Sequence, residues 1–339
     1  MRALGDLPAS KITTRDVDEL LETVAGTGVS PRTVNRHRDV VRAVFNFGVR
    51  SSRFKLASNP ATGSDSRRVA ALGDLVYYTP EEIELVAGAL EQGMHRQINQ
   101  NHARSCSSRR GARCDCTPTY GPRGQVFGTL GEARAFYRAA RGPGELAADR
   151  QDAEAVRVAA YAGLRMGELL ALRVGDVNRA GSVITVRRAI SAGVEKGPKS
   201  GRARYVPLAR PAAAALERLL DREDFTSADD YVFCSALGRR LDGSALRRRY
   251  KFARDAVGLR ALRRHDLRHT FGSLLVAGGV DLVSVKDAMG HAQLTTTTRY
   301  LHARPATERA AAFTAAFDAM AAGRPVAGGG DEQSGSRAA

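Results

Sequence analysis

Two arginines, two histidines and a tyrosine of this chain have the types and the order needed to attack a phosphodiester. They fall in Gly163-Leu-Arg165-Met-Gly-Glu168, in His265-Asp-Leu-Arg268 and in Gly290-His291, with Tyr300 nine residues after that histidine. Guanidinium groups bind the non-bridging oxygens of a phosphate through paired hydrogen bonds and stay charged at neutral pH. Because the transition state spreads charge over those oxygens, we expect Arg165 and Arg268 to stabilise it.

Tyr300 is the candidate nucleophile. A phenol has a pKa of about 10, so it needs a base and cationic surroundings to attack at neutral pH. His265 and His291 are the candidates to handle its proton and to hydrogen-bond the phosphate. The leaving 5′-hydroxyl also needs a proton, and a basic hairpin that contains Lys196 and Lys199 could deliver one.

The segments around these motifs predict a mainly α fold with one small antiparallel β-sheet. Residues 152–172 have the apolar spacing of a helix, which would carry Arg165. The stretch 183–190 alternates like a strand, and 204–208 can pair with it across the turn at Lys199. Further helices are predicted at 211–221, 243–257, 266–277, 281–289, 294–302 and 305–321.

A helical region precedes this catalytic part. Residues 11–57 predict two helices, the first capped by Thr14 and the second by Ser30, with Pro31 in its first turn. Thr79-Pro80-Glu81-Glu82 restarts the chain with a cap and a first-turn proline. We therefore divide the chain into a helical domain (1–60), for which the family resemblance described below implies DNA binding, a linker (61–78), a catalytic domain (79–321) and a disordered tail (322–339).

The charge of the chain favours a polyanionic partner. Lysine and arginine number 52 against 36 acidic residues, a net charge of +16, and DNA is the commonest partner for such a field. No run of 18 apolar residues is present to span a membrane, and four cysteines in so long a chain indicate a reducing, cytoplasmic compartment. The residues expected to contact DNA are Arg32, Arg36, Arg38, Arg42, Arg202 and Arg204.

The order and spacing of these motifs resemble the tyrosine recombinases, the family of phage integrases and chromosome-dimer resolvases. The resemblance covers roughly residues 4–321, apart from 92–148. Lys199 lies eight residues before Pro207, a spacing closer to that of the family's catalytic lysine than the spacing of Lys196. The catalytic set that the resemblance implies is Arg165, Lys199, His265, Arg268, His291 and Tyr300, with Glu168 and Asp176 as structural supports.

The resemblance also implies a reaction and partners. The tyrosine would attack double-stranded DNA at attachment sites and leave a 3′-phosphotyrosyl link and a free 5′-hydroxyl, so neither a cofactor nor a metal is expected. Relatives act as homotetramers that exchange a C-terminal helix, for which 305–321 is the candidate here. An excision factor or a host DNA-bending factor is a further expected partner, and the protein is expected with the nucleoid.

The segment 92–148 departs from the family pattern. It has little periodicity, and we expect an insertion, a small module or disorder. Part of it, 106–137, resembles the small N-terminal region of some actinobacterial-type integrases. The chain is also expected to start part-way into the family's core-binding domain (1–60), without the early helices of that domain. Cys106, Cys114 and Cys116, with His95 or His102, lack the paired spacing of structural zinc sites, and we expect free thiols.

Two other functions are compatible with these motifs. The missing early helices and the unusual segment would suit a catalytically inactive DNA-binding remnant of a mobile element, although all six catalytic positions are intact. A type IB topoisomerase shares the chemistry but relaxes supercoils without a partner site. The lysine hairpin and the spacing from Gly290-His291 to Tyr300 favour a recombinase.

Overall fold

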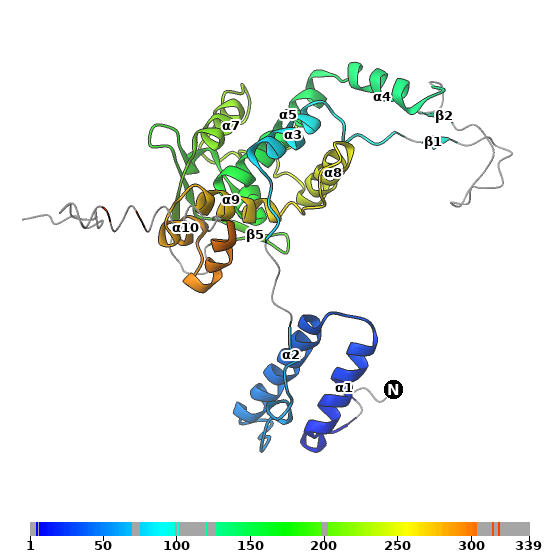
Figure 1. Cartoon of the computed structure of the whole chain (residues 1–339), viewed down its shortest axis with the longest axis vertical. Coiled ribbons are helices and arrows are strands. Elements are labelled where there is room, and N and C mark those ends of the chain that lie inside the picture. Colours follow the sequence, from blue (N-terminus) through cyan, green and yellow to red (C-terminus); the bar gives the residue numbers. More distant parts are fainter. Residues whose placement is uncertain are drawn as a thin grey trace, which may run out of the picture. The chain divides into compact units, whose positions relative to one another are not determined.

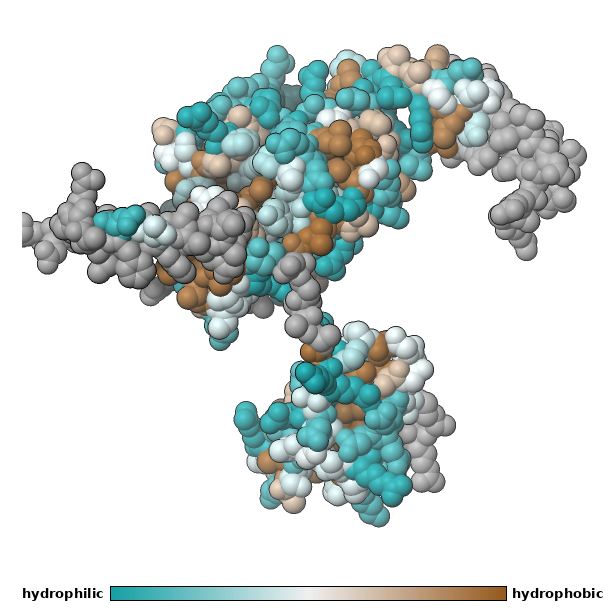
Figure 2. Space-filling view, viewed as in Figure 1, coloured by the Kyte–Doolittle hydropathy of each residue, from teal (hydrophilic) through white to brown (hydrophobic). Residues whose placement is uncertain are grey.

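The chain forms two compact units, Met1–Gly73 and Asp74–Ala339. The computed structural model describes residues 5, 7–69, 75–98, 100–101, 119–120, 127–197, 203–303, 314 and 318. Helices dominate the described part of both units, and small antiparallel sheets accompany them in the second unit, which confirms the predicted fold class (Figure 1). Hydrophilic residues cover much of the visible face of each unit (Figure 2).

The first unit is built on a pair of helices, α1 (Thr14–Gly26) and α2 (Pro31–Arg50). Thr13 caps α1 in a capping box with Asp16, so the predicted cap at Thr14 was wrong by one residue. Ser30 caps α2 with Pro31 in its first turn, as predicted. The short 3₁₀ helices of this unit are η2 (Ala9–Lys11) and η3 (Pro60–Thr62), and its small buried core is Val17, Leu21, Val34 and Ala61.

Most of the predicted linker 61–78 packs onto one unit or the other. In the first unit, Asn35 hydrogen-bonds the backbone of Arg67, and Arg38 Nε donates to the Ser64 carbonyl at 2.7 Å. In the second unit, Tyr78 is fully buried. The polar composition of this segment suggested a solvated connection, but backbone groups of Ser64, Arg67 and Tyr78 are hydrogen-bonded by side chains of neighbouring helices.

The core of the second unit lies among five helices. These are α3 (Pro80–Glu91), α5 (Pro143–Ala162), α7 (Arg210–Leu220), α8 (Gly243–Ala256) and α9 (Asp266–Ala277). Helices α3 and α5 lie side by side (Figure 1). The capping box of Thr79 with Glu82 opens α3 as predicted. Side chains of this core that are almost fully buried include Leu90, Val156, Leu216, Phe233 and Leu246.

The described parts of 92–148 contain more regular structure than the sequence indicated. A short helix, α4 (Leu130–Ala139), begins at the cap Thr129, and α5 begins at Pro143. Two short strands, β1 (Gln100–Asn101) and β2 (Thr119–Tyr120), pair antiparallel. None of the helices in the described part of the chain is long and apolar enough to cross a membrane.

A three-stranded antiparallel sheet, in the order β3-β4-β7, begins after the short helix α6 (Met166–Ala171). It consists of β3 (Val177–Asn178), β4 (Val183–Val186) and β7 (Arg204–Pro207), and Ile184 lies opposite Val206. This confirms the predicted pairing of the two segments. The strand predicted at 183–190 is shorter, because the chain leaves β4 after Val186 and forms a separate hairpin of β5 (Ala189–Ser191) with β6 (Val194–Lys196).

The helix predicted at 152–172 is two helices with a break between them. Helix α5 ends at Ala162, Gly163 adopts the left-handed conformation with φ of 61°, and α6 runs over Met166–Ala171. A Cβ at Gly163 would lie 2.2 Å from Cδ1 of Phe271. Glycine is therefore needed here because of the left-handed backbone conformation and because there is no room for a side chain. Arg165 is therefore the N-cap residue of α6 and does not lie within a helix, contrary to the prediction.

Candidate active site

Arg268 lies in the first turn of α9 and its side chain is buried. Its guanidinium donates to two backbone carbonyls, that of Gly163 at the end of α5 and that of Met289 at the end of helix α10 (Leu282–Met289). Burial, followed by the charge of Arg165, lowers the pKa of Arg268 to about 10. The group thus remains charged at neutral pH, and two chain segments fix its position.

Arg165 is held by hydrogen bonds but faces solvent in part. Its Nη1 donates to Glu168 Oε1 at 2.9 Å and its Nη2 to the Gly290 carbonyl at 3.0 Å, while 45% of its side chain is exposed. Because Gly290 follows Met289 directly, adjacent carbonyls orient the two arginines. Arg165 and Arg268 thus converge at the end of α10, as the motifs predicted.

Glu168 joins three segments of the site. Arg204 donates to both of its carboxylate oxygens, at 2.7 and 2.9 Å, and the backbone N–H of Arg165 donates at 2.8 Å. Burial alone would raise the pKa of Glu168, but these hydrogen bonds and charges lower it to about 2. Arg204 was expected to contact DNA, which stays a prediction; in the structure its guanidinium is paired with this buried carboxylate.

Tyr300 lies on the 3₁₀ helix η6 (Thr298–Ala303) and is fully buried. The predicted helix 294–302 is two 3₁₀ segments, η5 (Leu294–Thr296) and η6. The Tyr300 hydroxyl lies 2.9 Å from Nδ1 of His269, a residue that the sequence analysis did not select. The ring of His291 stacks nearly parallel to the Tyr300 ring, with centroids 6.4 Å apart.

The charge state of this cluster follows from burial and from the arginines. Burial raises the pKa of Tyr300, and the charges of Arg268 and Arg299 oppose the rise only in part. Burial, followed by the charge of Arg268, lowers the pKa of His291 to about 4, and burial, followed by the charge of Arg299, lowers that of His269 to about 4. Both imidazoles are therefore neutral at pH 7, and each has one ring nitrogen free to accept a hydrogen bond.

His265 occupies the N-cap position of α9 without a side-chain capping bond, and its side chain is exposed. Its ring meets the edge of the His269 ring, with centroids 5.7 Å apart, and in the described part of the chain it has no hydrogen bond to Tyr300. Desolvation, followed by the charge of Arg268, lowers the pKa of His265. His269 follows His265 by four residues, so both lie on one face of α9. This spacing of four residues is the sequence feature that could have indicated His269 as a further site residue.

The remaining predicted site residues lie elsewhere or outside the described residues. Lys199 and Arg202 are outside them, as are Cys106, Cys114, Cys116 and His102. Arg32, Arg36 and Arg42 are exposed on α2, whereas Arg38 bonds the Ser64 carbonyl. His95, considered as a zinc ligand, is buried with Nε2 3.4 Å from Asp149.

Comparison with known proteins identifies the family. The model of the "Phage integrase family" matches residues 132–307, just over half of the chain. The chain belongs to this family of tyrosine recombinases. Tyrosine recombinase XerC of Corynebacterium efficiens is 32% identical over 154 residues, which is 45% of this chain and 46% of that protein. XerC of Pseudomonas fluorescens is 34% identical over 154 residues, 45% of this chain and 48% of that protein. The chain thus spans about half the length of these curated relatives.

Solved structures of integrases share the fold of this family member. The Tn1549 transposon integrase in complex with transposon right end DNA superposes with a TM-score of 0.63 at 17% identity, over 94% of this chain and 89% of that one. A lambda integrase dimer bound to a COC′ core site gives a TM-score of 0.55 at 14% identity, over 88% of this chain and 83% of that one. The actinobacterial subtype stays a prediction.

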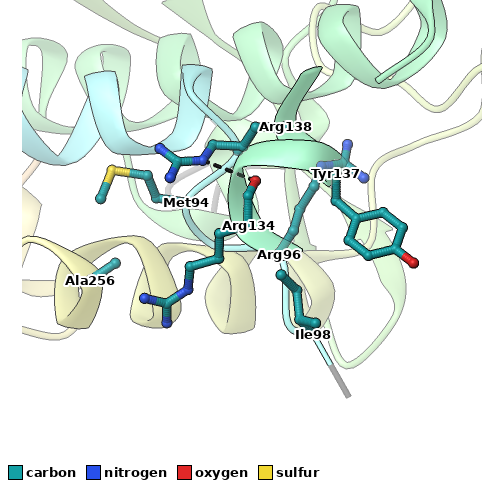
Figure 3. Close-up of a pocket in the computed structure, with 8 residues that line it drawn as sticks. Met94, Arg96, Ile98, Arg134, Tyr137, Arg138 and Ala256 are labelled. Carbon is teal, nitrogen blue, oxygen red and sulfur yellow. Dashed lines mark hydrogen bonds between the residues drawn. The ribbon is translucent and has the colours of Figure 1, made fainter. Parts of the chain in front are cut away.

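A pocket away from this cluster contains none of the predicted catalytic residues. It lies beside α4, and Arg134 and Arg138 of that helix line it together with Met94 and Arg96 (Figure 3). Arg96 is already paired with Asp149 and Glu145, and Arg138 donates to the Arg134 carbonyl. The pocket is therefore not part of the candidate active site.

The close packing around Tyr300 makes Gly272 of α9 sensitive to substitution. A Cβ at this position would lie 2.8 Å from Cε2 and Cζ of Tyr300 and 2.9 Å from Sδ of Met289. We expect Gly272→Ala to lower the free energy of unfolding by about 1–3 kcal/mol, measured by chemical denaturation, and to displace the tyrosine. Gly88→Ala in α3 is the matched control, because a Cβ there meets nothing within 4 Å. Equal stability of the two variants would contradict the expectation.

Proposed function

We propose that this protein is a site-specific DNA recombinase, an integrase that cuts and rejoins DNA through a 3′-phosphotyrosyl intermediate. The observation that carries the proposal is the convergence of Arg165, Arg268, His291 and Tyr300. They come from four segments, and the carbonyls of Gly290 and Met289 orient the two guanidiniums. Fixed cations beside a phenol suit attack on a phosphodiester.

In the proposed reaction Tyr300 attacks the scissile phosphate, which Arg165 and Arg268 hold. His265 and His291 hydrogen-bond the phosphate, and Lys199 protonates the leaving 5′ oxygen. A 5′-hydroxyl of a partner strand then reverses the step and releases the tyrosine. Because one phosphoester replaces another at each step, the exchange needs no nucleotide cofactor.

DNA is the proposed partner. The net charge of +16 and the exposed Arg32, Arg36 and Arg42 support contact with phosphates, and Arg202 is a further candidate. The related Tn1549 integrase was solved with transposon DNA. We also propose a homotetramer on attachment sites, exchange of the segment 305–321 between subunits, and help from an excision or host DNA-bending factor. Such a protein would act in the cytoplasm, with the nucleoid.

A trapping experiment tests the proposed function. Nicked duplexes from the DNA that flanks this gene lose a short fragment on cleavage, so that the covalent intermediate cannot be resealed. The expected result is a denaturant-resistant protein–DNA adduct that is absent for Tyr300→Phe. Tyr161→Phe is the matched control, because the Tyr161 hydroxyl bonds Pro80 and Glu84 and, among the described residues, none of the candidate catalytic ones, and it should retain the adduct.

Other outcomes would support the alternative functions. DNA binding without an adduct, on a wide panel of flanking duplexes, would indicate an inactive remnant. Adducts on unrelated sequences, together with relaxation of supercoiled DNA, would indicate a topoisomerase.

A further inference from the structure

We propose that His269 is the residue that takes the phenolic proton of Tyr300 when the tyrosine attacks DNA. The inference rests on the proposed function and adds a residue to its chemistry. In the described part of the chain, His269 is the histidine whose ring nitrogen reaches the reacting oxygen, with 2.9 Å between Nδ1 and the hydroxyl. The hydroxyl can donate only if Nδ1 is the unprotonated nitrogen of the ring.

The two histidines selected from the sequence are not placed to do this. The His291 ring lies face to face with the tyrosine, at 12° between planes, and its Nδ1 is 3.0 Å from Thr297 Oγ1. His265 contacts the ring of His269, with no hydrogen bond to Tyr300 in the residues that the structure describes. The proposed role of His265 and His291 is therefore to hydrogen-bond the phosphate.

The surroundings of His269 keep its imidazole neutral before the attack. Burial, followed by the charges of Arg299 and His265, lowers the pKa of His269 to about 4, which leaves Nδ1 free to accept the phenolic hydrogen bond at neutral pH but also makes the ring a weaker base. Arg268 lies close enough to Tyr300 to offset part of the burial that disfavours a phenolate. A neutral base and a nearby cation thus act on the same hydroxyl.

The proton transfer balances in both directions. As the bond between Tyr300 Oη and phosphorus forms, the bond from phosphorus to the 5′ oxygen breaks. The phenolic proton moves to His269 Nδ1, which becomes part of an imidazolium, and the 5′ oxygen takes a proton from the proposed acid, Lys199. On rejoining, the 5′-hydroxyl returns its proton to the acid, and the departing phenolate regains one from His269.

The first test measures adduct formation by His269→Asn on two suicide duplexes. One has the normal 5′ oxygen at the scissile bond and the other has sulfur there, because a thiolate leaves without a proton. We expect His269→Asn to react about 10²- to 10⁴-fold more slowly on both duplexes, with unchanged DNA affinity. Lys199→Ala should be slow on the oxygen duplex alone. His37→Asn, on α2 with its ring bonded to the Thr33 carbonyl, is the matched control.

The pH profile separates a proton acceptor from a residue that only positions the tyrosine. The wild-type rate should be flat between about pH 6 and 8, whereas the rate of His269→Asn should rise about tenfold per pH unit as hydroxide replaces the imidazole. A loss of rate that is independent of pH would overturn the proposal in favour of positioning. Normal or faster cleavage by His269→Asn would overturn it as well. The hydrogen bond between His269 and Tyr300 would then only hold the tyrosine in its buried position in the absence of DNA.

A measurement on the free protein needs no DNA cleavage. Nitrogen-15 spectra of labelled histidines, assigned with His269→Asn, should show His269 with its proton on Nε2 and an unprotonated Nδ1. A protonated Nδ1 would overturn the proposal. Failure of the proposed function is distinguishable, because the wild-type protein would then form no adduct, whereas failure of this inference leaves wild-type adduct formation intact.

Discussion

Arg268→Ala is expected to slow formation of the protein–DNA adduct by about 10³- to 10⁵-fold, the range observed when an arginine is lost from a phosphoryl-transfer site. The side chain is buried, and two carbonyls fix its guanidinium, so neither water nor a neighbouring arginine can replace it. Arg268→Lys should also be slow, because an ammonium lacks the planar fork that spans both carbonyls and a phosphate. Single-turnover assays at saturating DNA measure the effect.

The control for this prediction is Arg179→Ala. Arg179 forms an ion pair with Asp221, and both side chains are largely exposed, so its loss should leave cleavage within a few-fold of wild type. Thermal unfolding of both variants separates a chemical defect from a folding defect. Loss of less than about tenfold in Arg268→Ala, in a folded protein, would show that Arg268 does not stabilise the transition state.

Glu168→Gln is expected to have the largest effect on stability. The buried carboxylate accepts both prongs of Arg204 and a hydrogen bond from Arg165, and the amide would leave these cations without a counter-charge. Breaking a buried ion pair by removing one partner costs about 3–5 kcal/mol. Urea denaturation at neutral pH measures the change in the free energy of unfolding.

The same carboxylate makes stability depend on pH in a defined direction. Its pKa falls from 4.5 in the unfolded chain to about 2 in the folded protein. The contribution of Glu168, about 3 kcal/mol, is therefore fully present above pH 4.5 and is lost as the pH falls toward 2. Glu168→Gln should lack this part of the acid-induced loss of stability.

Glu84→Gln is the matched control for Glu168→Gln. Glu84 pairs with Arg157 but is about half exposed, so its replacement should change the free energy of unfolding by about 1 kcal/mol or less. Equal effects of the two substitutions would refute a special role of the buried carboxylate.

The sequence predicted those elements whose signals are local. The cap and first-turn proline at Ser30-Pro31 and at Thr79-Pro80 located two helix starts correctly, and alternation located β4. The break at Gly163 could not be predicted in this way, because the apolar spacing continues across it. Phe271, which leaves no room for a Cβ at Gly163, is more than a hundred residues away.

The same distinction applies to the site. Motif order selected Arg165, Arg268, His291 and Tyr300, which the structure brings together. Arg204 could not be told apart from the other basic residues, because its role depends on facing a buried carboxylate from another segment. His269 was overlooked because its contact with Tyr300 requires the packing of η6 against α9.

The candidate active site can be completed only late in the synthesis of the chain, because the carbonyls that orient its arginines belong to Met289 and Gly290. Arg165 and Arg268 are synthesised before their acceptors at Met289 and Gly290 and before the candidate nucleophile Tyr300. A growing chain that ends before this point lacks one of the two carbonyls that hold Arg268, the carbonyl that holds Arg165 and the candidate nucleophile. If the proposed function holds, products of premature termination upstream of Tyr300 would keep the arginines proposed to contact DNA but could not form the covalent link.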